Sequence, residues 1–73
     1  MKRIGLIAGS GQFPIIFSKA AKEKGLEVFA VAHLKETDPG LEGCVHGIKW
    51  IKLGQLGAMI RFLKARFSFI VRL

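Results

Sequence analysis

The sequence predicts an α/β fold: a short parallel sheet of three or four strands with two main helices. Two observations predict it. The apolar runs at residues 4–8 and 28–32 have apolar side chains on both faces, which is typical of strands buried within a parallel sheet. Between these runs, and again after residue 54, apolar residues recur every three or four positions, as on one face of a helix. This alternation is typical of a three-layer, Rossmann-like half-fold.

The first strand, the first helix and the second strand form a βαβ unit. We expect the strands at Ile4–Ala8 and Val28–Ala32. Pro14 suits the first turn of the intervening helix, because its missing N–H is no loss there, and Gly25 can end the helix in the left-handed conformation. The core-facing stripe of this helix is expected to consist of Phe13, Ile16, Phe17, Ala20 and Ala21.

The second half of the chain continues the pattern. Residues 33–47 are expected to form a loop, with a helical turn near Leu41. Ile48–Leu53 contains two lysines among apolar residues, which predicts a third strand at a sheet edge. A fourth strand is expected at Phe67–Val71, beside the first strand and on the side away from the second. The second helix precedes it, with a stripe of Leu56, Met59, Ile60 and Leu63.

Composition limits the classes of partner. The 73 residues are 51% hydrophobic, which suits one core-forming domain over residues 1–73 and not a disordered tail. The net charge of +7 favours anionic partners, but the Lys and Arg residues are spread out, so we interpret most of them as solvated. No apolar run approaches the roughly 18–20 residues of a spanning helix. The single cysteine, Cys44, excludes an internal disulfide and fits a reducing cytoplasm.

A glycine-rich turn between the first strand and the first helix is the main candidate binding site. It consists of Gly9, Ser10, Gly11 and Gln12. The two glycines allow a phosphate to approach the backbone, and the following helix directs its unpaired amides and positive dipole end at that phosphate. A dinucleotide is disfavoured, because Pro14 replaces the third glycine of the fingerprint and no carboxylate ends the second strand. The alternative is a tight turn that binds nothing.

Two further pairs of residues follow strands, on the side where open α/β sheets bind ligands. Thr37 and Asp38 follow the second strand, and Lys52 and Gln55 follow the third. Lys52 can offset a phosphate charge, and Gln55 can bond a base. Each pair also has a structural interpretation, because Asp38 before a proline forms turns and Gln55 can cap its helix.

The residues predict no catalytic or metal centre. Cys44, His46 and His33 are the candidate zinc ligands, but a zinc site needs a second well-spaced pair. The carboxylates either flank a helix end or share one loop, and no pair suggests general acid–base chemistry. We therefore expect binding residues in this chain and no catalytic residue.

Three segments occur in a specific order and spacing: residues 3–14 (RIGLIAGSGQFP), 36–39 (ETDP) and 50–57 (WIKLGQLG). Together they resemble the N-terminal domain of the LpxI-type UDP-2,3-diacylglucosamine pyrophosphatases, from Arg3 to Lys64. Members of that family are bacterial enzymes of lipid A synthesis. They hydrolyse UDP-2,3-diacylglucosamine to lipid X and UMP, with water attacking the α-phosphorus. The resemblance implies a UDP-linked diacylglucosamine as the ligand.

The resemblance also implies that the catalytic machinery lies elsewhere. Family members carry a second domain that supplies the catalytic carboxylate and the metal chemistry, usually with Mg²⁺. We therefore expect a truncated N-terminal domain that is inactive alone, in the cytoplasm, with peripheral contact to the inner-membrane surface left open. After Lys64 the sequence departs from the family pattern. A truncation or frame change near residue 65 would explain that departure.

A function of another class is a small basic module that binds nucleic acid or an anionic membrane surface. The net charge of +7 motivates it. Nucleic acid is not the favoured partner, because the sequence has no basic-aromatic signature of an RNA-binding sheet. A third alternative is a fragment that folds poorly.

Overall fold

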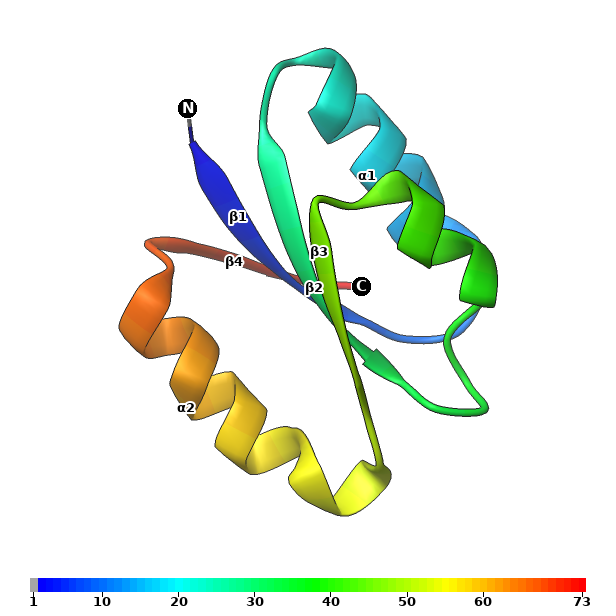
Figure 1. Cartoon of the computed structure of the whole chain (residues 1–73), viewed down its shortest axis with the longest axis vertical. Helices are drawn as coiled ribbons and strands as arrows, with labels where there is room; N and C mark the ends of the chain where they lie inside the picture. The colour runs from blue at the N-terminus through cyan, green and yellow to red at the C-terminus, as the bar shows by residue number, and fades with distance from the viewer. Residues whose placement is uncertain (1) are drawn as a thin grey trace.

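The computed structural model describes residues 2–73 and consists of a four-stranded sheet between two helical layers (Figure 1). The strands are β1 (Arg3–Ala8), β2 (Glu27–His33), β3 (Gly47–Ile51) and β4 (Phe69–Arg72). They lie in the order β3-β2-β1-β4, and every pairing is parallel. The predicted α/β class, the edge position of the third strand and the place of the fourth strand beside the first are confirmed.

Helices cover both faces of the sheet. α1 (Phe13–Glu23) and the short 3₁₀ helix η1 (Pro39–Cys44) lie on one face, and α2 (Leu56–Arg66), preceded by η2 (Leu53–Gln55), lies on the other (Figure 1). Burial on both faces explains why the strand sequences are continuously apolar instead of alternating. Within the described residues, no helix combines the length and apolarity needed to cross a bilayer.

The core is divided by the sheet into two clusters. Leu6 points to the α1 side, where it packs in one cluster with Leu41 of η1. The next residue, Ile7, points to the α2 side and packs with Val31 and Leu63. This alternation follows from the two-residue period of a strand. A sequence of only 73 residues thus supplies two thin cores.

The end of α1 is a Schellman motif. Gly25 has a φ of +78°, and its amide donates to the carbonyl of Lys22 at 3.0 Å, while the amide of Leu26 donates to the carbonyl of Ala21 at 3.0 Å. These two bonds satisfy carbonyls that the helix leaves unpaired at its end. The predicted role of Gly25 is confirmed.

The predicted core-facing stripe of α1 is wrong in part. Phe13 is 72% exposed and Ile16 is 59% exposed. Ala20 is exposed as well. The buried residues of this helix are instead Pro14, Ser18 and Ala21, with Phe17 half-buried. Two overlapping stripes fit the helical repeat, and the stripe that faces the sheet carries the small side chains Ser18 and Ala21, which allow close packing of the helix on the strands.

Two predicted strand boundaries move inward by two residues in the structure, while the others that differ extend the strand by one residue. β3 ends at Ile51 and not at Leu53, because Lys52 and the residues after it begin η2. β4 begins at Phe69 and not at Phe67, because Phe67 still belongs to the end of α2, where its amide donates to the carbonyl of Leu63 at 2.8 Å. Both shifts occur where a helical hydrogen bond competes with strand pairing.

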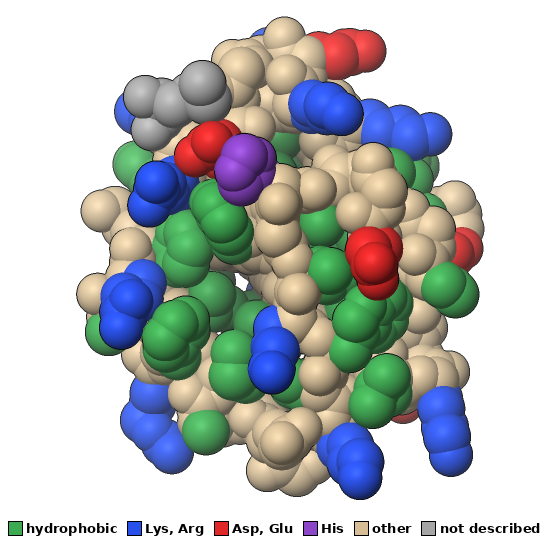
Figure 2. All heavy atoms as spheres, in the orientation of Figure 1, with side chains coloured by type: hydrophobic (Ala, Val, Ile, Leu, Met, Phe, Trp, Pro, Cys, Tyr) green, Lys and Arg blue, Asp and Glu red, His purple; other side chains and the backbone are tan. Residues whose placement is uncertain are grey.

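Most of the cationic side chains lie apart from one another over the face shown in Figure 2, although two at the upper right adjoin. On this face the distribution agrees with the interpretation of most Lys and Arg residues as solvated.

Leu41→Ala is expected to leave the chain largely unfolded. Leu41 is 0% exposed, and a buried Leu→Ala change costs about 2–5 kcal/mol. A core in a chain of this size rarely contributes more than about 3–5 kcal/mol. Urea unfolding followed by far-UV circular dichroism measures the effect. The control is Leu53→Ala, at a side chain that is 75% exposed, and an equal loss there would contradict the role of Leu41.

Candidate functional site

The glycine-rich turn lies at the carboxyl end of β1 and is open to solvent. Residues 9–12 belong to no helix or strand, and Ser10, Gly11 and Gln12 are exposed. Gly11 has a φ of +85°, and a Cβ placed there would meet nothing within 4 Å. This position therefore requires glycine for its backbone conformation and not for lack of space. α1 begins directly after the turn, at Phe13, so its unpaired amides and positive dipole end adjoin the turn.

Three of the four amides of the turn are unpaired. Within residues 2–73, the amides of Ser10, Gly11 and Gln12 donate to no acceptor. The Gly9 amide donates to the carbonyl of Leu73, because β4 lies beside β1 and the pairing continues past its last residue. The amide of Gly9 thus serves the sheet in this structure, and the amides of the next three residues are the ones left for a ligand.

A hollow of about 220 Å³ opens beside Gly9 at the carboxyl ends of β1, β2 and β4. Arg72, at the end of β4, and His33, at the end of β2, are among its lining residues. The full lining is Ile7, Ala8, Gly9, His33, Leu56, Arg72 and Leu73. The hollow therefore combines an apolar floor with one permanent positive charge.

The carbonyl of Ala8 holds the loop after β2 in place. It accepts a hydrogen bond from Thr37 Oγ1 at 3.0 Å and lies 3.2 Å from Nδ1 of His33. Because a carbonyl only accepts, this contact assigns the ring hydrogen to Nδ1 and leaves Nε2 of the neutral ring as an acceptor. Thr37 Oγ1 also accepts from the His33 amide at 2.9 Å. The hydroxyl of Thr37 is buried and used within the protein.

Two of the predicted groups are in direct contact. Gln12 Nε2 donates to Asp38 Oδ2 at 2.9 Å, which joins the glycine-rich turn to the loop after β2. The other carboxylate oxygen of Asp38 accepts from the amide of Gly40 at 2.8 Å and caps η1. Asp38 therefore also has the turn-forming role that its sequence context suggests.

The other predicted pair lies away from this contact. Gln55 Oε1 accepts from the amide of Lys52 at 2.9 Å, so it caps the helical segment after β3, as the structural interpretation expects. β3 is the edge strand, and β2 separates it from β1. Only the neighbouring Leu56 reaches the hollow beside Gly9.

The candidate zinc ligands are not brought together. His33 contacts Ala8 at the carboxyl edge, while His46 pairs with Glu27 near the amino edge. The thiol of Cys44 donates to the carbonyl of Gly40 at 3.5 Å. In the described part of the chain, no three His, Cys, Asp or Glu side chains are placed to hold a metal ion.

The sequence analysis does not assign His33 and Arg72, which line the hollow beside Gly9, to the candidate phosphate site. Their place in the chain is the feature that could identify them. Each is the last residue of its strand, and residues at the carboxyl ends of strands line the ligand sites of open parallel sheets. Arg72 was missed because the fourth strand was expected to end one residue earlier.

Thr37→Val is expected to destabilise the fold by about 1–3 kcal/mol, because the change is nearly isosteric but leaves the part-buried amide of His33 without this acceptor. Thr37→Ser is the matched control, since it keeps the hydroxyl and loses only a methyl group, at about 0.8 kcal/mol. Urea unfolding measures both. A larger loss in the serine variant would show that packing, and not hydrogen bonding, holds this loop.

Comparison with known proteins identifies the family. The family model of the LpxI N-terminal domain matches residues 3–67 of the 73-residue chain. A search of curated proteins found none that matches. The matched range contains the glycine-rich turn, the loop after β2 and both main helices. The chain therefore belongs to the LpxI N-terminal domain family.

Proposed function

We propose that this chain is the nucleotide-sugar-binding part of a UDP-2,3-diacylglucosamine hydrolase. Its family is one of lipid A biosynthesis. The observation that carries the proposal is the set of unpaired amides in the glycine-rich turn, at the amino end of α1. Backbone amides at a helix amino terminus suit the diphosphate of a UDP-linked ligand.

The residues around the turn have distinct roles in this proposal. The amides of Ser10, Gly11 and Gln12 donate to the diphosphate oxygens. Arg72 adds a charge-assisted hydrogen bond from the end of β4. The bond between Gln12 and Asp38 holds the turn against the next loop, which reduces the conformational freedom that binding must remove.

His33 contributes at the other side of the hollow. Its Nδ1 is engaged with Ala8, so Nε2 is left to accept a hydrogen bond from a ligand hydroxyl. Lys52 and Gln55 lie beyond β2 and belong to the periphery of the proposed site.

The proposed whole-enzyme reaction cleaves the pyrophosphate with water at the α-phosphorus, giving lipid X and UMP. Mg²⁺ is the ion that the family resemblance implies. The side chains of residues 2–73 do not form a set of ligands that fits it, and we derive no step through a metal ion. We propose that the catalytic groups lie outside this domain and that the chain alone binds without cleaving. The proposal includes a cytoplasmic location with peripheral contact to the inner membrane, because the substrate carries two acyl chains.

Gly11→Ala is expected to weaken UDP binding about tenfold or more, measured by calorimetry. A Cβ at a φ of +85° would turn the amides away from the ligand, and one hydrogen bond to a charged group contributes about 1.5–3 kcal/mol. Gly25→Ala is the matched control. Gly25 has a φ of +78° and equally open space, so both variants lose about 1–2 kcal/mol of stability, but only Gly11→Ala alters the site.

Two results would contradict the binding proposal. One is the absence of heat with UDP or UMP from a chain whose far-UV spectrum shows helix and strand. The other is equal weakening by Gly11→Ala and Gly25→Ala, which would trace the loss to general instability.

The chain incubated with UDP-2,3-diacylglucosamine and Mg²⁺ is expected to release no lipid X or UMP above a protein-free control. The physical reason is that, among the described residues, no three His, Cys, Asp or Glu side chains are placed to hold a metal ion. Thin-layer chromatography of the lipid products checks this. Turnover would show that the chain contains catalytic groups, and it would leave the binding proposal intact.

A further inference from the structure

A second cleft lies at the opposite end of the sheet, where the start of β1 meets the turn between α2 and β4. Its volume is about 360 Å³. Three cations and two phenylalanines line it, with a serine and no carboxylate: Lys2, Arg3, Arg66, Phe67, Ser68 and Phe69. The six residues of β1 separate it from the glycine-rich turn, a distance of about 20 Å at about 3.3 Å per residue. The two sites are therefore distinct.

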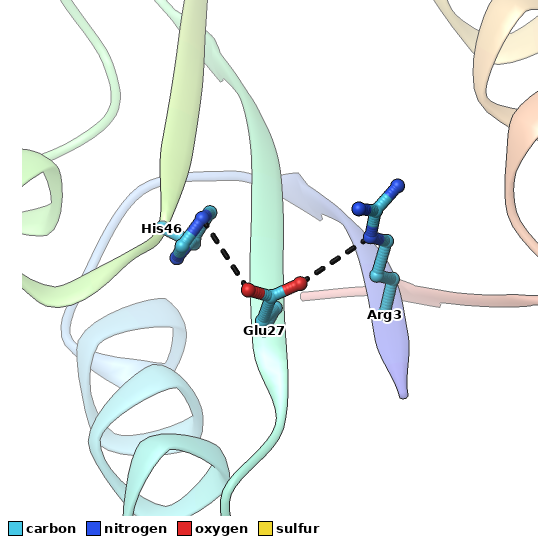
Figure 3. Close-up of polar contacts among 3 residues, drawn as sticks. All are labelled: Arg3, Glu27 and His46. Atoms are coloured by element: carbon cyan, nitrogen blue, oxygen red, sulfur yellow. Dashed lines mark hydrogen bonds and ion pairs between the residues drawn. The ribbon is translucent and has the colours of Figure 1, made fainter. Parts of the chain in front are cut away.

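The positive charge of this cleft is only partly neutralised. Arg3 Nε lies 3.3 Å from Glu27 Oε1, and the other oxygen of Glu27 lies 3.4 Å from His46 Nε2 (Figure 3). One carboxylate is thus shared between Arg3 and His46, and the Arg3 side chain is still 66% exposed. Within residues 2–73, Lys2 and Arg66 form no ion pair.

The dipole of α2 explains the position of only one of these three cations. Arg66 lies in the last turn of that helix, where the carbonyl end favours a cation. Lys2 and Arg3 come from the start of the chain and receive no such explanation. The fold brings them to Arg66 across about sixty residues of sequence.

Aromatic rings lie directly beside the cations. Lys2 Nζ is 5.3 Å from the centre of the Phe69 ring, and Arg66 Cζ is 4.8 Å from the centre of the Phe62 ring. Phe69, which lines the cleft, is 55% exposed, and Phe62, which lies outside its lining, is 47% exposed. Exposed rings among unpaired cations suit a ligand that has both phosphates and planar bases.

We infer that this cleft binds single-stranded nucleic acid through its phosphates and bases. A single strand fits better than a duplex, because stacking on Phe69 requires an unpaired base. A concave lining fits an inserted nucleotide better than a flat bilayer surface. A free nucleotide also has a phosphate and a base, and the experiment below distinguishes it from an oligonucleotide. Ser68 and Phe69 lie beyond the range that the family model matches, so the cleft goes beyond the proposed function.

The first test is a titration of the whole chain with a short thymidine oligonucleotide, followed by amide chemical shifts in NMR. Shifts are expected at residues 2–3 and 66–69. The logarithm of the affinity is expected to fall with the logarithm of salt concentration with a slope of about −2, for three cations at about 0.7 each. Shifts confined to residues 9–12 would overturn the inference without affecting the proposed UDP site. UMP that shifts residues 66–69 as strongly as the oligonucleotide, at equal affinity, would identify the free nucleotide as the source.

The second test compares variants by fluorescence anisotropy of the labelled oligonucleotide. Arg66→Gln is expected to reduce the salt slope by about 0.7. Phe69→Leu is expected to weaken binding about tenfold and leave the slope unchanged, because it removes only stacking. Lys19→Gln is the matched control, since it removes one exposed cation from α1, away from the cleft.

Circular dichroism first confirms that each variant is folded. If Phe69→Leu does not fold, the inference is tested by the salt dependence of oligonucleotide binding to Arg66→Gln. If Lys19→Gln weakened oligonucleotide binding as much as Arg66→Gln does, the binding would be due to diffuse charge attraction. This result would overturn the inference. So would binding to vesicles of phosphatidylcholine and phosphatidylglycerol with no binding to the oligonucleotide.

Discussion

The structure depends on the burial of residues 5–8 of β1 in the middle of the sheet. This strand pairs with β2 on one edge and with β4 on the other, and its side chains enter both cores in turn. Leu6 and Ala8 are 0% exposed. A strand that is paired on both edges and packed on both faces has one register available to it. A slip by one residue would move each side chain from one core cluster to the other. The positions of both ends of β1 follow from that register.

The two ends of β1 carry different chemistry because all four strands run in the same direction. At the carboxyl end, the chain turns through glycines into the amino terminus of α1, which leaves backbone donors unpaired. At the amino end, the start of β1 lies beside the end of α2, where cations are favoured. The same topology therefore separates the proposed site of backbone amides from the proposed site of basic and aromatic side chains.

The glycine-rich turn shows how pairing in the sheet limits the backbone donors of the proposed binding site. Pairing with β4 uses the amide of Gly9 and draws the end of the chain against the turn. The same pairing brings Arg72 to the hollow, so the strand that removes one donor also supplies a cation. Nearby, the Ala8 carbonyl serves both His33 and Thr37. Some polar groups of the proposed site thus hold the loops in place, and others have no partner within residues 2–73 and are available to a ligand.

The sequence by itself determined the order of the elements, the end of α1 at Gly25 and the location of the glycine-rich turn. These are local properties, because periodicity and helix stops depend on residues close together in the chain. Only the tertiary structure decided that Phe13 and Ile16 are exposed, that Gln12 meets Asp38, and that Lys2 lies over Phe69. Such contacts join residues that are far apart in sequence, and they exist only once the strands have paired and the helices have packed. The physical reason is that a local pattern specifies which faces of an element are apolar, whereas packing selects which of those faces is buried.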